Sequence, residues 1–127
     1  MGFDVSTVEL QDTTTVDLLH PVTGEEIGAS VTVYGQDSDK YKTEARRCED
    51  QVGKYAQKNR GKMMPSADRE AMDRRKIINC VASVDGLLKD KKPWTDVAEI
   101  LKTDWIYEQV CAAIVDRANF MKGSPAK

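Results

Sequence analysis

A change of hydrophobic period near residue 35 is the feature that most constrains what this chain can fold into. Before it, apolar residues occupy every second position, at Ile27, Ala29, Val31 and Val33. After it, they recur at intervals of four and three, at Tyr41, Ala45, Cys48, Val52 and Tyr55. Period two is typical of a half-buried strand, and a mean period near 3.6 is typical of an amphipathic helix that faces a core. The sequence therefore contains both kinds of element, which predicts an α+β fold.

The strand pattern predicts one half of a β-hairpin. The preceding segment begins with the β-branched run 13–16, and Pro21 to Gly24 is a turn signal, since proline presets φ and glycine tolerates positive φ. We therefore expect strands at about residues 13–20 and 27–34. An isolated hairpin is marginal in water, so this one must pack against the elements that follow.

Four helical segments are expected after the hairpin. Asp37 or Ser38 can cap the first, and the second should run over about residues 67–88 as the central core helix. A short helix around residues 97–101 and a last helix over about 104–120 complete the chain. The predicted fold is helix-dominated α+β: an N-terminal β-hairpin followed by about four α-helices. Its buried core should include Ile78, Val81, Ile106, Val110 and Ile114.

The length of 127 residues fits a single domain. We expect residues 1–12 to form a flexible arm, residues 13–122 the domain, and residues 123–127 a flexible tail. The N-terminus has neither the basic nor the apolar region of a signal peptide. Apolar runs reach only a few residues, far short of the roughly 20 that cross a bilayer, so no membrane contact is expected.

Charge is distributed unevenly along the chain, although the net charge is only −2. Residues 1–39 carry eight acidic and no basic residues, whereas residues 40–62 carry eight basic and three acidic residues, a net +5. Opposite patches of this kind can bind head to tail, which builds rings or filaments. The alternative is a pair of ordinary solvated faces. The residues predicted for self-association are Asp17, Glu25 and Glu26 on the acidic side and Arg46, Arg47 and Lys54 on the basic side.

The residue pattern offers no catalytic, cofactor-binding or metal-binding set. His20 is the only histidine, and its place beside a turn predicts a surface or capping role. Cys48, Cys80 and Cys111 lie about thirty residues apart with no Cys-x-x-Cys pair, so a zinc site is not expected. No Gly-rich phosphate loop is present, and the acidic first third disfavours nucleic acid. We therefore expect a protein that is not an enzyme, uses no cofactor and binds no nucleic acid.

The two tryptophans, Trp94 and Trp105, each stand next to a predicted helix start. Aromatic residues at such corners can anchor an interface. Trp94, Trp105 and the nearby Tyr107 are therefore the candidate partner-binding residues. The alternative is that these rings wedge helices together inside the core.

Two groups of short motifs carry a family resemblance through their order and spacing. The first comprises Leu19-His20-Pro21-Val22-Thr23-Gly24-Glu25, Ile27-Gly28 and Val31-Thr32-Val33-Tyr34-Gly35-Gln36-Asp37-Ser38. The second comprises Asp104-Trp105-Ile106-Tyr107-Glu108-Gln109-Val110 and Asp116-Arg117-Ala118-Asn119-Phe120-Met121. They resemble the opening hairpin and closing helix of tail assembly chaperones from long-tailed bacteriophages, over about residues 15–121. The chain departs from that pattern at Val84-Asp85-Gly86-Leu87, where a tryptophan would be expected before the Gly-Leu pair.

The resemblance implies a function that composition does not show. Such chaperones coat the long, aggregation-prone tape measure protein in the host-cell cytoplasm until tail tube subunits displace them. They are absent from the mature virion. This chain is accordingly expected to bind and solubilise a tape measure protein, with the tail tube protein as a further partner. The alternative is a structural component of the virion tail, such as a tail completion or tube-associated protein.

Overall fold

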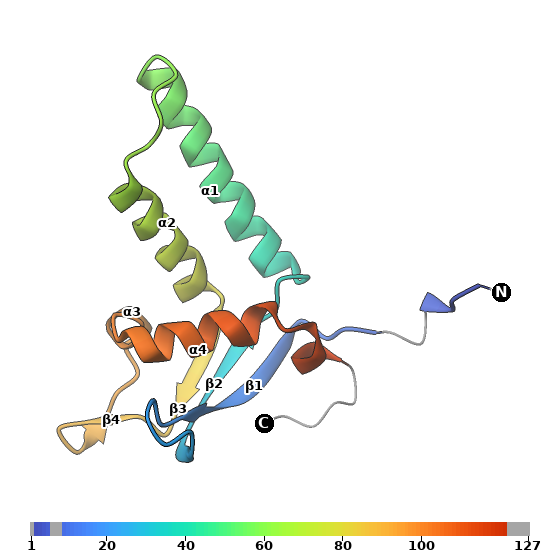
Figure 1. Ribbon diagram of the computed structural model, residues 1–127, viewed down its shortest axis with the longest axis vertical. Helices are drawn as coiled ribbons and strands as arrows, with labels where there is room; N and C mark the ends of the chain where they lie inside the picture. Colours follow the sequence, from blue (N-terminus) through green and yellow to red (C-terminus); the bar gives the residue numbers. More distant parts are fainter. Residues whose placement is uncertain (1, 6–8, 122–127) are drawn as a thin grey trace.

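The computed structural model describes residues 2–5 and 9–121, and Figure 1 shows its course. The elements in chain order are β1 (Thr13–Leu19), β2 (Glu26–Tyr34), α1 (Asp39–Lys58), α2 (Ser66–Asn79), β3 (Val81–Asp85), β4 (Leu88–Lys89), β5 (Lys92–Pro93), α3 (Val97–Ile100), α4 (Asp104–Val115) and the 3-10 helix η2 (Arg117–Phe120). The predicted α+β fold, with an N-terminal hairpin and about four helices, is confirmed. The predicted tail, residues 123–127, lies outside the described residues.

The hairpin forms where the alternating pattern placed it. β1 and β2 pair antiparallel, with Thr14 opposite Val33 and Val16 opposite Val31. This register puts the apolar positions of both strands on one face, while Thr15 and Thr32 lie on the other with their hydroxyl oxygens 2.7 Å apart. The sheet therefore has one core face and one polar face, as antiparallel sheets commonly do.

His20 shapes the turn between these strands. Its Nδ1 atom accepts hydrogen bonds from the backbone N–H groups of Val22 (3.1 Å) and Thr23 (3.2 Å). Gly24 follows with a φ of +72°, a conformation that glycine adopts without strain. The capping role predicted for His20 is confirmed.

The core lies between the sheet and the C-terminal helices. Ile106, Val110 and Ile114 project from α4 and are at most 2 % exposed, as predicted. They share one cluster with the buried strand residues Leu18, Ala29, Val31 and Val33 and with Ile100 and Leu101 from the α3 region. The other two predicted core residues, Ile78 and Val81, are only half-buried, and Ile77 is the buried residue of α2 instead.

The expected helix over residues 67–88 is wrong in its second half. α2 ends at Asn79, and the next residues form β3, which pairs antiparallel with β2 as the third strand of the sheet. The expectation of a single hairpin is wrong as well, because the described chain has this three-stranded sheet and a small β4–β5 hairpin. A register shift between Thr32 and Val33 interrupts the β2–β3 ladder, which is the mark of a bulge.

The last helix is shorter than the predicted 104–120. α4 ends at Val115, and Asp116 takes an extended conformation with a ψ of 100°. The Asp116 carboxylate then accepts a hydrogen bond from the Ala118 N–H (3.1 Å) and caps η2. This turn returns Phe120 to the core, where it is 3 % exposed.

The end of the predicted N-terminal arm contacts the domain. Leu10 forms an isolated bridge with Met121, and the Gln11 N–H donates to the Phe120 carbonyl at 2.7 Å. Residues 10 and 11 are thus attached to the C-terminal segment, whereas Phe3 and Val5 are largely exposed. Residue 1 and residues 6–8 of the predicted arm lie outside the described chain.

Candidate binding surface on the α1–α2 hairpin

α1 and α2 form a helical hairpin that extends away from the sheet. Figure 1 shows the two helices side by side, with their connection at the far end and α4 crossing near their base. The two helices pair where Met72 of α2 faces the apolar stripe of α1. The hairpin therefore projects away from the core.

The start of α1 is fixed by a buried serine. Ser38 Oγ donates a hydrogen bond to the Gly35 carbonyl (2.7 Å) and accepts one from the Tyr41 N–H (3.2 Å). This is the N-cap that the sequence predicted at Asp37 or Ser38. A Cβ at Gly35 would lie 3.0 Å from the Phe120 ring, so the chain enters the helix through a tightly packed corner.

Two further contacts attach this corner to the end of α4 and the start of η2. The Gln36 side-chain amide donates to the Val115 carbonyl at 2.9 Å. Arg117 forms a two-bond ion pair with the Asp37 carboxylate, at 2.7 and 3.1 Å. The hydrogen bond from Arg117 is the main reason that the pKa of Asp37 is lowered from its ordinary value.

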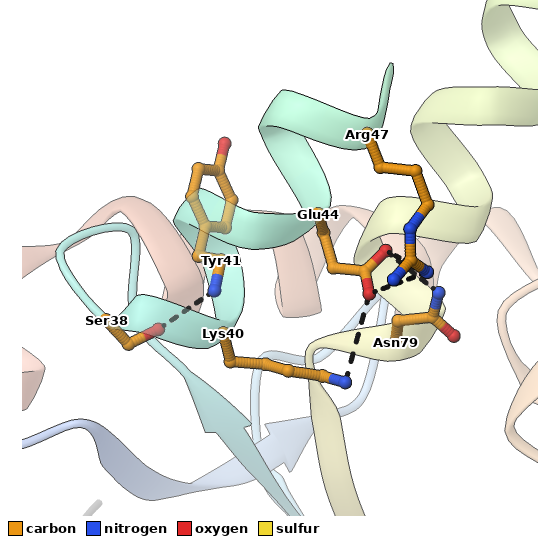
Figure 2. Close-up of polar contacts among 6 residues, drawn as sticks. All are labelled: Ser38, Lys40, Tyr41, Glu44, Arg47 and Asn79. Carbon is orange, nitrogen blue, oxygen red and sulfur yellow. Dashed lines mark hydrogen bonds and ion pairs between the residues drawn. The ribbon is translucent and has the colours of Figure 1, made fainter. Parts of the chain in front are cut away.

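A buried carboxylate joins the two helices near their base (Figure 2). Glu44 is 4 % exposed, and Asn79 Nδ2 donates to its Oε2 atom at 3.1 Å. Arg47 Nη1 lies 3.3 Å and Lys40 Nζ 3.8 Å from Oε1. A buried charge is tolerated only where partners of this kind replace its hydration. Glu44 thus links α1 to the residue that ends α2.

Arg74 connects α2 to the start of α4. Its Nη1 atom donates to the Leu101 carbonyl at 2.6 Å, and its Nη2 atom lies 3.2 Å from the Asp104 carboxylate. The guanidinium also stands 4.3 Å from the centre of the Tyr107 ring, in cation–π geometry. The hairpin is therefore held at its base on two sides, by Arg74 and by the Gln36–Arg117 corner.

Further from the base, the hairpin lacks a closed core. Among the twenty residues of α1, all of them described, Glu44 is the buried one, and among those of α2 it is Ile77. The five stripe residues of α1, Tyr41 to Tyr55, are all half-buried. The prediction that the stripe faces the main core is wrong for Ala45, Cys48 and Val52, because these three lie against α2.

A groove of about 330 Å³ runs between the two helices. We call it the α1–α2 groove, and its lining is Ala45, Cys48, Glu49, Val52, Arg69, Met72, Asp73 and Lys76. Its floor is apolar, and its rim carries two acidic and two basic side chains. None of these four charges forms an ion pair with another residue in the described part of the chain. The Lys76 ammonium stands 5.2 Å from the centre of the Tyr41 ring, in cation–π geometry.

The cysteines are poorly suited to nucleophilic chemistry. Burial raises the pKa of all three thiols and is the main cause of each shift. The pKa of Cys80 is raised to about 11. Raised values keep a thiol protonated near neutral pH, and the thiol is the less reactive form. Cys48 Sγ instead makes a weak hydrogen bond to the Met72 carbonyl at 3.7 Å, across the groove.

The three aromatic residues predicted to bind a partner do not form one surface. Trp94 lies beyond the β4–β5 hairpin with Lys89 Nζ 5.1 Å from its ring. Trp105 and Tyr107 are two positions apart on α4, so they point to different sides of the helix. All three are half-buried and pack against the core, which is the alternative considered for the tryptophans.

The residues predicted for self-association lie in two separate regions. Asp17, Glu25 and Glu26 are exposed in and beside the β1–β2 turn, and Arg46, Arg47 and Lys54 are exposed on α1. In Figure 1 the turn and the α1–α2 connection lie at opposite ends of the molecule. Arg47 already pairs with Glu44, which leaves Arg46 and Lys54 as the better-placed cations.

The groove and the buried carboxylate were not anticipated, since each arises from residues that two helices bring together. The described residues contain no group of three or more His, Cys, Asp or Glu side chains placed to hold a metal ion. Among residues 2–5 and 9–121, no helix combines the length and apolar character needed to cross a membrane. No protein-family model matches the chain, and neither a curated protein nor a solved structure is significantly similar to it.

Proposed function

We propose that this protein is a non-enzymatic tail assembly chaperone that binds a phage tape measure protein and keeps it soluble. It acts in the host-cell cytoplasm, is displaced by tail tube subunits and is absent from the mature virion. The motifs at residues 19–38 and 104–121 support the family assignment. The structural support comes from one observation, the half-exposed apolar stripe of α1 on a projecting hairpin.

A surface of this kind suits a holding chaperone. Apolar area on the floor of the α1–α2 groove is removed from water only in part, so a partner can gain free energy by covering it, at about 25 cal/mol per Å². The charged rim keeps the free protein from presenting one continuous apolar patch. A chaperone of this type needs no catalytic group. By binding the soluble state of its partner, it stabilises that state by mass action.

Co-expression with the cognate tape measure protein tests the proposal. We expect most of the tape measure protein to be soluble and to co-purify with this chain, and to be insoluble when it is expressed alone. The fraction in the soluble lysate, measured by quantitative immunoblot, is the readout. Equal solubility with and without this chain, and no co-purification, would contradict the chaperone function. Finding the chain in purified virions would favour a structural tail component instead.

Self-association between the two charged ends is a second expectation. A contact between the acidic turn of one copy and α1 of the next should weaken as salt is added, because exposed charges are screened beyond about 8–10 Å at physiological ionic strength. Light scattering across a salt series is the measurement. Lys54→Glu should abolish assembly at low salt, and Lys54→Glu combined with Glu26→Lys should restore part of it. Assembly that is indifferent to salt and to both variants would refute a charge-based contact.

A further inference from the structure

The outer part of the α1–α2 hairpin is an incomplete helical packing unit. In this pair the two helices alone leave the apolar stripe half-buried, and helical bundles close such cores with further helices. Here Val52 of α1 and Met72 of α2 line the floor of the groove and stay half-exposed. The groove has α1 and α2 as its two walls. The side that faces away from both walls is open, and a third helix can pack there.

We propose that the α1–α2 groove binds one amphipathic α-helix of the tape measure protein, which packs as the third helix of the hairpin. This inference rests on the proposed function and names the contact surface within it. The bound helix presents apolar residues at positions i, i+3 or i+4, and i+7 to Val52 and Met72.

The walls of the groove favour a helix over an extended segment. Both walls are α-helices, whose backbone N–H and C=O groups are already bonded within each helix. They offer no ladder of free backbone groups to a bound strand, so an extended peptide would lose hydrogen bonds to water without replacement. A helix satisfies its own backbone and brings only side chains to the groove.

The charge of the hairpin favours a helix from a different protein over a second copy of the hairpin as the bound partner. Residues 40–62, which include most of α1, carry a net charge of +5, so two hairpins packed on each other would bring like charges together. A partner helix with more acidic than basic residues beside its apolar stripe avoids this repulsion. Its acidic residues can pair with Arg69 and Lys76, and its basic residues with Glu49 and Asp73.

Overlapping peptides of the cognate tape measure protein, each about 20 residues long, provide the probe. We expect a subset with an amphipathic, net acidic pattern to bind the full chain and to become helical, as measured by fluorescence anisotropy and circular dichroism. Val52→Glu and Met72→Glu should each weaken binding by about tenfold or more, since each places a charge on the apolar floor. Ala71→Glu and Gln57→Glu are the matched controls, because they add the same charge at exposed positions of α2 and α1 outside the groove lining.

The unmodified chain offers a second readout that does not depend on how a variant folds. Cys48 lines the groove, whereas Cys111 lies on α4. A bound helix should slow alkylation of Cys48 by N-ethylmaleimide, resolved by peptide mass spectrometry, and leave the rate at Cys111 unchanged.

The outcomes separate the two proposals. If the tape measure protein co-purifies but the groove variants bind like their controls and Cys48 stays reactive, the groove assignment is wrong and the chaperone function stands. If no tape measure protein or peptide binds the unmodified chain, the chaperone function itself fails. Protection of Cys48 that grows with protein concentration in the absence of peptide, at a salt concentration that screens the contact between the charged ends, would show a second copy in the groove and overturn the inference.

Discussion

Replacing Ile114 with alanine is expected to lower the free energy of unfolding by about 2–5 kcal/mol. Ile114 is fully buried between α4 and the sheet, in the cluster that includes Val31 and Val33. Removing three carbon atoms there costs their transfer free energy and leaves a cavity that the surrounding β-branched side chains can fill only in part. Urea unfolding, with the free energy extrapolated linearly to water, measures the change.

Neighbouring positions supply the controls for this substitution. Val115→Ala changes the next residue on the same helix, but Val115 is 53 % exposed, so its effect should stay within about 0.5 kcal/mol. Ile78→Ala should fall between the two, because Ile78 is only half-buried. A loss below about 1 kcal/mol for Ile114→Ala would mean that the core lies elsewhere.

The parts of the fold that could be predicted from sequence are those where one period governs an uninterrupted segment. β2 alternates without interruption from Ala29 to Tyr34, and α1 keeps its four–three spacing from Tyr41 to Tyr55. In each case the local pattern and the tertiary packing require the same arrangement. The bounds of β2 and the start of α1 were therefore predicted to within one or two residues, with Ser38 as a cap candidate.

β3 was not predicted because a bulge changes the spacing of its apolar residues. Val81 and Val84 both pack against the core, although three positions separate them, because the register shift opposite Thr32 and Val33 adds a residue to β3. A spacing of three is what a helix would show, so the segment extended the helical pattern of α2. The β-branched residues and Gly86 were the contrary signals, and neither outweighs periodicity in a single sequence.

The candidate surface was predicted in part. The apolar stripe of α1 was visible in the sequence, but whether a stripe is covered depends on how much of the chain packs on it. The Arg74 contacts join positions about thirty residues apart, and no local pattern encodes them. The burial of Glu44 runs against its residue type, since carboxylates are almost never fully buried unless they are paired. Such features become visible only when the tertiary contacts are known.

Gly86→Ala is expected to destabilise the protein by about 2–5 kcal/mol, through two effects that add. Gly86 follows directly after β3 with a φ of +82°, a conformation that costs L-residues about 1–2 kcal/mol. A Cβ at this position would also overlap the Gly28 carbonyl oxygen and lie 3.0 Å from Ala29 Cα, both on β2. Because these are backbone atoms, they cannot move aside as a side chain would, and overpacking of this kind costs about 1–3 kcal/mol more.

Gly24→Ala is the matched control for the second effect. Gly24 has a similar φ of +72°, but no atom lies within 4 Å of the Cβ it would gain. Its substitution should therefore show only the conformational cost of about 1–2 kcal/mol. The difference between the two variants in urea unfolding measures the close approach of the end of β3 to β2. Equal losses of unfolding free energy at both positions would mean that the backbone beside Gly86 moves to accommodate the added Cβ without cost. The end of β3 would then be held less tightly than the structure shows.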